Sequence, residues 1–206
     1  LTITFGAVDW LMSLDPHWFS TVFGILIAAG QVTASLAFMI AVVAIVGQIP
    51  PFAQIITTQH ISDLGSLLLT TVIFWTYIAF VQFFIIWSGN LPEDVVWYID
   101  RLEGGWNWIA IVLLVFHSIV PFILLLSNDL KRDRRKLAGV ALMVLAAELV
   151  NLWWLVAPTF SAEHLTIHWL DVVMPIFLGA LWIAAYVWRL RRQGITESAA
   201  PVVDVH

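Results

Sequence analysis

The amino-acid sequence predicts an all-α integral membrane protein, a helical bundle of about five transmembrane helices with a short interfacial helix. Two observations lead to this fold class. The 206 residues are 61% hydrophobic and 11% charged, whereas soluble domains are about half apolar and about a quarter charged. Long intervals also hold no charged residue, for example between Asp15 and Asp63 and between Glu103 and Asp129. Because a spanning helix needs about 20 mostly apolar residues, each interval has room for one.

The boundaries of the elements follow from these intervals. Helices are expected because a spanning segment in lipid must satisfy its own backbone hydrogen bonds. Pro92 is a favourable start for a short interfacial helix that runs to about Arg101. Residues 195–206 form a predicted polar tail, expected to be disordered. The five transmembrane spans are predicted over residues 19–46, 64–87, 105–126, 137–156 and 167–188.

The cations set the predicted orientation. All of the nine lysines and arginines except Arg101 lie between the third and fourth spans or after the fifth. Short cytoplasmic loops are enriched in Lys and Arg, so this basic side, with the C-terminus, is predicted to be cytoplasmic. Most of the twelve tryptophans fall in or beside the opposite segments. An aromatic belt at the interface and a docking surface for other subunits both explain that excess.

Composition also limits the chemistry that the chain can carry. Without cysteine, it holds no disulfide, iron–sulfur ligation or attached c-type haem. A transmembrane b-type haem held by two histidines is not expected, since His117 is the only histidine at membrane depth. His164 and His168 lack a third ligand, so no metal site is expected. The net charge of −5 gives no basic surface for nucleic acid.

Three stretches of the sequence carry a resemblance to a known family, and the turn SNDLKR at 127–132 fits it as well. The stretches are DWLMSLDPHWFST at 9–21, WSGNLPED at 87–94 and NLWWLVAP at 151–158. Together they resemble the NrfD/polysulfide-reductase-like membrane subunits of bacterial alternative complex III, a quinol:electron-acceptor oxidoreductase, and among these the ActF type. The resemblance covers nearly the whole chain and corresponds to the C-terminal half of a full-length member.

The resemblance implies a subunit of the bacterial inner membrane that anchors redox subunits, guides protons and contacts menaquinone or ubiquinone. The implied partners are membrane lipid, a second NrfD-like subunit, and multihaem cytochrome c and iron–sulfur subunits on the periplasmic side. Those partners would carry the haem and iron–sulfur centres and pass electrons to cytochrome c or a copper protein. Two alternatives stay open: half of an inverted-repeat secondary transporter, and a purely structural membrane anchor.

Ionisable residues inside the membrane are candidates for function. His117 lies about 16 Å along the third span and Glu148 about 18 Å along the fourth, at 1.5 Å per residue, so both are near the middle of a core about 30 Å thick. The two spans are consecutive and antiparallel, which lets these side chains approach each other. They form either a proton relay or a neutral hydrogen-bonded pair. Asn151 shares a helix face with Glu148. Asp171, one turn inside the fifth span, extends the relay or stabilises its helix N-terminus.

A second group of candidates lies at the predicted outer edge of the membrane. It combines acid, imidazole and aromatic side chains: Asp9, Asp15, His17 and Trp18. A quinol site needs hydrogen-bond acceptors, a proton exit and apolar walls, and this group supplies part of that set. Tyr77 and Gln82 in the second span are more remote candidates. The competing interpretations are a contact with another subunit and a turn at Asp15-Pro16 that precedes the first span.

Overall fold

A computed structural model describes residues 2–50 and 52–192 of the chain. No strand occurs within these ranges, and five helical spans are long and apolar enough to cross a membrane. The predicted fold class is therefore confirmed, and the predicted tail at 195–206 lies outside the described residues. The five spans are α2 (Phe23–Val46), α4 (Thr58–Gly89), the segment Trp106–Leu126, α9 (Arg134–Val156, continued to Thr159 by a short 3-10 turn) and α10 (Trp169–Arg192).

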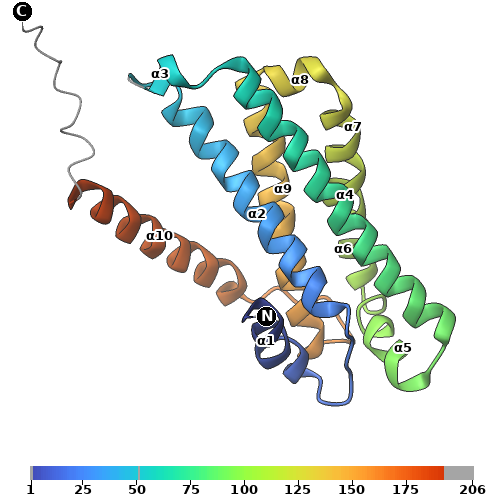
Figure 1. The fold of residues 1–206 in the computed structure, drawn as a ribbon. Helices are drawn as coiled ribbons and strands as arrows, with labels where there is room; N and C mark the ends of the chain where they lie inside the picture. The colour runs from blue at the N-terminus through green and yellow to red at the C-terminus, as the bar shows by residue number, and fades with distance from the viewer. Residues whose placement is uncertain (1, 51, 193–206) are drawn as a thin grey trace, which may run out of the picture. The chain divides into compact units, whose positions relative to one another are not determined.

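The first four spans form one compact unit within residues 1–165, and α10 belongs to a second unit, residues 166–206. In the first unit the long helices run side by side, with α2 packed against both α4 and α9 (Figure 1). Short helices lie at the ends of this bundle: α1 (Thr2–Trp10) and α5 (Pro92–Ile99) at one end, α3 (Phe52–Ile55) and α8 (Asn128–Arg132) at the other (Figure 1). These are called the α5 end and the α8 end below.

Most predicted span boundaries lie within four residues of the observed ones, and the largest difference is at the start of α4. The helix α4 begins six residues before the predicted Leu64, because Thr57 caps it: its hydroxyl accepts from the His60 amide and His60 Nδ1 accepts from the Thr57 amide, both at 3.3 Å. The short helices α1, α3 and α8 were not predicted. The short interfacial helix is present as α5, with Pro92 in its first turn.

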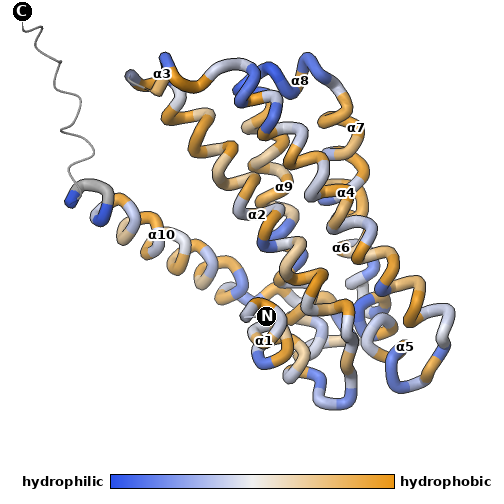
Figure 2. The backbone as a smooth tube through the Cα atoms, in the orientation of Figure 1, coloured by the Kyte–Doolittle hydropathy of each residue, from blue (hydrophilic) through white to orange (hydrophobic). Residues whose placement is uncertain are grey.

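Two buried clusters hold the four-span unit together. The cluster at the α5 end is aromatic and includes Trp18, Phe23 and Trp97. The cluster toward the α8 end is aliphatic and includes Ala37 and Leu137. The long helices also expose many large hydrophobic side chains, and hydrophobic residues predominate along their length (Figure 2). That pattern is expected when lipid, and not water, surrounds the bundle.

Hydrophilic residues are concentrated at the two ends of the bundle (Figure 2). At the α8 end, Lys131 Nζ donates to Ser66 Oγ at 3.3 Å and Arg134 donates to the backbone carbonyl of Gly47. Asp133 caps α9 by accepting from the Arg135 and Lys136 amides at 3.0 and 3.2 Å. These bonds hold the pKa of the Asp133 carboxyl below its ordinary value. The basic turn therefore ties α2, α4 and α9 together.

Candidate functional site

The third span is interrupted by a widened turn that carries His117. Between α6 (Trp106–Leu113) and α7 (Val120–Leu126), residues Leu114–Ile119 form a π-helical segment, η2. Pro121 is the second residue after this segment. Proline has no amide hydrogen and its ring clashes with the carbonyl four residues earlier, here that of His117. Proline is thus the signal in the sequence for this irregular turn, and π-helical turns occur often at functional sites.

The structure brings His117 and Glu148 into contact inside the four-span unit. His117 Nε2 lies 2.8 Å from Glu148 Oε2, and the two residues are 0% and 4% exposed. Asn151 Nδ2 also donates to Glu148 Oε2, at 3.4 Å. The 2.8 Å distance is that of an ion pair, but neither nitrogen of His117 makes a well-directed hydrogen bond to any described residue. The imidazole therefore has bonding capacity that the described protein atoms leave unused.

A glycine on α2 makes room for the Glu148 carboxyl group. A Cβ atom at Gly30 would overlap Glu148 Oε1. On the other side, the ring of Trp75 in α4 lies 3.9 Å from the His117 ring, centroid to centroid. The pair is thus enclosed by α2, α4 and α9. Sequence reasoning identified the pair and Asn151, but it missed Gly30 and Trp75.

Gly30→Ala is expected to displace the Glu148 carboxyl group and to destabilise the bundle by about 1 to 3 kcal/mol, the usual cost of overpacking a tight core. Thermal unfolding of the purified protein measures this loss. Gly139→Ala is the matched control, because a Cβ there meets no atom within 4 Å and alanine favours a helix over glycine. Equal stability of the Gly30→Ala variant and the unchanged protein would contradict the described packing.

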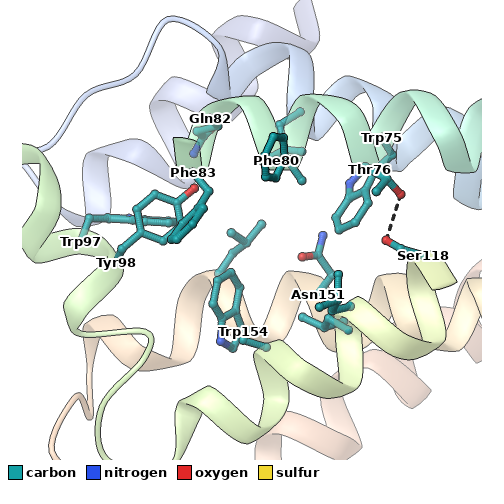
Figure 3. Close-up of a pocket in the computed structure, with 16 residues that line it drawn as sticks. Trp75, Thr76, Phe80, Gln82, Phe83, Trp97, Tyr98, Ser118, Asn151 and Trp154 are labelled. Carbon is teal, nitrogen blue, oxygen red and sulfur yellow. Dashed lines mark hydrogen bonds between the residues drawn. The ribbon is translucent and has the colours of Figure 1, made fainter. Parts of the chain in front are cut away.

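An inner cavity of about 440 Å³ lies beside the pair, bounded by α2, α4, α5, α6, η2 and α9 (Figure 3). Its polar and aromatic lining includes Trp75, Thr76, Gln82, Tyr98, Asn151 and Trp154. Two of these residues also touch the pair: Asn151 contacts Glu148, and Trp75 packs against His117. The cavity and the pair are therefore separated by a single layer of side chains. Of the remote candidates, Gln82 lines this cavity.

The four candidates near the N-terminus are not brought into one pocket. Asp9 and His17 are exposed, whereas Trp18 is buried and stacks on Trp97 with ring centroids 4.4 Å apart. None of the four, all within the described part of the chain, lines the inner cavity. Trp18 instead stacks on Trp97, and Trp97 is part of the cavity wall. Their predicted contact with quinone or a partner subunit stays a prediction.

Asp15 lies near Arg101, a buried residue that sequence reasoning did not single out. Arg101 donates to the carbonyls of Trp97 and Leu155 at 3.0 and 2.8 Å and to Thr159 Oγ1 at 3.2 Å. Its guanidinium also stacks over the Trp97 ring at 3.7 Å. Burial lowers the pKa of Arg101 to about 10, and the nearby carboxylate of Asp15 opposes that shift. Arg101 thus joins α5 to the end of α9.

Asp171 belongs to the second unit. Its Oδ2 accepts a hydrogen bond from the His168 amide at 2.9 Å, at the start of α10. This is the contact expected of an acid that stabilises a helix N-terminus. Its predicted place in a proton relay stays a prediction.

No protein-family model matches the sequence, and no curated protein matches it. The three stretches that carry the family resemblance nevertheless meet at the α5 end of the bundle. Trp18 of the first stacks on Trp97, which follows the second, and Trp97 also makes an edge contact with Trp154 of the third, at 6.3 Å between centroids. Trp97, which follows the second stretch, thus contacts both of the others, and of the three stretches only the third contributes residues to the wall of the inner cavity.

Proposed function

We propose that the chain is a membrane subunit of a quinol-oxidising electron-transfer complex of the alternative complex III kind. It anchors the redox subunits and handles protons through His117 and Glu148. The observation that carries the proposal is this buried pair, 2.8 Å apart within helices of membrane-spanning length. Oxidation of a quinol releases protons, and a buried carboxyl group beside an imidazole can accept and pass them on. Isolated ionisable groups are costly in a membrane, which favours a functional role.

The geometry supports a short path for a proton. Asn151 lies in the wall of the inner cavity and donates a hydrogen bond to Glu148 Oε2. Only this one side chain therefore separates the Glu148 carboxyl group from the cavity at this point. From Glu148 Oε2 the proton can be shared with His117 Nε2. The sequence has no cysteine for a cluster, so the electrons pass to partner subunits that carry haem and iron–sulfur centres.

The proposal includes a location and partners. The complex lies in the bacterial inner membrane, with the basic α8 end and the C-terminus in the cytoplasm, as the distribution of Lys and Arg favours. The α5 end then faces the periplasm. Multihaem cytochrome c and iron–sulfur subunits bind there, and a second NrfD-like subunit lies beside this one in the membrane. Menaquinone or ubiquinone is the substrate.

The two alternatives predict different features. A transporter of the inverted-repeat kind uses broken helices around a central site. In the four-span unit α2, α4 and α9 are continuous helices, and the third span is interrupted only by the widened turn η2, without a break in the helical path. A structural anchor needs no buried pair of titratable groups, whose desolvation opposes folding. The electron-transfer subunit accounts for both the pair and the cavity beside it.

Purification of the native complex in a mild detergent tests the proposal. We expect co-purifying subunits with multihaem and iron–sulfur centres, a c-type haem spectrum, and oxidation of added quinol. A chain that purifies without haem-bearing partners and without this activity would overturn the proposal and favour the transporter.

A further inference from the structure

We propose that the basic turn, residues 131–136, binds the phosphate of an anionic phospholipid through Lys131 and Arg135. The turn holds five of the nine lysines and arginines of the chain, with only Asp129 and Asp133 as acids beside them. It belongs neither to the buried pair nor to the lining of the inner cavity. The inference therefore goes beyond the proposed function and does not depend on it.

Lys131 is a buried cation without an acidic partner. The residue is only 9% exposed, and its Nζ donates to Ser66 Oγ at 3.3 Å. The Ser66 hydroxyl is neutral, and it donates its own hydrogen to the Ser62 carbonyl at 3.0 Å. No carboxylate of the described residues lies within ion-pair distance of the Lys131 ammonium group. An ammonium group has three donors, and a buried lysine is normally paired, so Lys131 requires an anion from outside this part of the chain.

The packing of Lys131 against α4 fixes the position of its charge. A Cβ atom at Gly65 would lie 2.9 Å from Lys131 Cγ, closer than packing allows. The methylene stem therefore lies against the backbone of α4, and the ammonium group reaches Ser66 at the end of the stem. Lysines at the edge of a membrane commonly adopt this arrangement. The ammonium group is thus placed before any anion binds.

The other charges of the basic turn leave Arg135 available. Lys136 Nζ lies 3.5 Å from Asp133 Oδ2, and Arg134 donates to the carbonyl of Gly47. Arg135 is exposed and forms no ion pair with a described residue. Asp133 accepts from the amides of residues 135 and 136, so an anion must bind through side chains and not through these amides. The planar fork of an arginine matches the oxygens of a phosphate.

The basic turn lies at the depth of phospholipid phosphates. The helix α9 has 23 residues, a length of about 35 Å at 1.5 Å per residue, and the hydrocarbon core is about 30 Å thick. The first turn of α9 therefore lies at the edge of the core. The link between the end of α7 at Leu126 and the start of α9 at Arg134 consists only of residues 127–133. Such a short link keeps the cations close to the membrane surface.

The surroundings favour a lipid over a soluble anion. Leu67, which follows Ser66, is 54% exposed, and Leu126 is 57% exposed. Apolar surface thus borders the cations. A phospholipid supplies a phosphate for Lys131 and acyl chains for the leucines, whereas a free phosphate would leave the apolar surface uncovered. Clusters of lysine and arginine directly beside a spanning helix are a usual contact for anionic lipids.

Photolabelling of the protein, purified with its native partners and reconstituted in phosphatidylcholine vesicles, tests the inference. The probe is a phosphatidylglycerol with a photoreactive group next to its phosphate, added as a trace. We expect label on residues 127–136 and on the neighbouring part of α4. The label should persist against the excess of phosphatidylcholine and fall when unlabelled phosphatidylglycerol is added.

Two matched substitutions locate the site. Lys131→Met keeps the unbranched stem and removes the charge, and it should lower labelling by about tenfold, as expected for the loss of a hydrogen bond to a charged group. Lys136→Met makes the same change at an exposed lysine that is already paired with Asp133. It should lower labelling by less than about twofold, because exposed ion pairs contribute little.

A third variant covers the case in which Lys131→Met fails to assemble. Arg135→Gln changes an exposed side chain and should lower labelling by about five- to tenfold. Equal losses in Lys131→Met and Lys136→Met would show a response to net charge alone and would overturn the site. Labelling that a neutral phosphatidylcholine probe reproduces, or that inorganic phosphate suppresses as well as phosphatidylglycerol does, would overturn the choice of an anionic lipid.

Discussion

Glu148→Gln is expected to lower quinol oxidation by the assembled complex at least about 100-fold, the usual contribution of a group that transfers a proton. Glutamine has nearly the same shape, so it fits beneath Gly30 and still reaches Asn151. It cannot take up a proton, and it leaves His117 without its acidic partner. Turnover of the purified complex with added quinol, together with proton release followed by a pH indicator, measures the effect.

Asp63→Asn is the matched control for that substitution. It makes the same change from acid to amide on an exposed residue of α4, where Asp63 accepts from Gln59 at 2.8 Å. Turnover of this variant should equal that of the unchanged complex. If the Glu148→Gln complex also keeps its full turnover and proton release, the pair serves packing alone and the structural-anchor alternative is favoured.

Arg101→Ala is expected to destabilise the α5 end by about 3 kcal/mol, from the loss of charged hydrogen bonds and of a desolvated cation–π contact. The substitution removes donors to the Leu155 carbonyl and to Thr159 Oγ1, and it removes the stack on Trp97. The lost stability comes from these contacts and from packing. Burial of the charge itself is unfavourable, as the lowered pKa of Arg101 shows.

Thermal unfolding of the complex in detergent and limited proteolysis near α5 measure this second effect. Arg101→Lys should recover part of the stability, since an ammonium group keeps one donor but loses the planar fork. Arg132→Ala removes an exposed arginine at the opposite end and should change little. Wild-type stability of Arg101→Ala would mean that the buried contacts contribute nothing to the fold.

The sequence was sufficient for the architecture and for the pair at its centre. Charge-free intervals located the spans, because lipid excludes charge over the length of a helix. The antiparallel order of the third and fourth spans placed His117 and Glu148 at the same depth. This argument needs only the helical rise and the order of the spans.

The surroundings of the pair could not be predicted in the same way. Gly30 is required by one close approach between α2 and α9, and nothing in its local sequence announces that contact. The inner cavity is built from residues on several helices far apart in the chain, so it depends on packing details. Arg101 did have a signal: it is the one lysine or arginine on its side of the predicted membrane, in a segment rich in tryptophan, and the ring of Trp97 stacks on its guanidinium.

Infrared difference spectroscopy of the complex on addition of quinol tests the central claim most directly. The account predicts a change in the C=O stretching band of a protonated carboxyl group during turnover, and the absence of that change in the Glu148→Gln variant. A carboxyl band that responds to quinol equally in both proteins, or that does not respond in the native complex, would contradict a role for Glu148 in proton transfer.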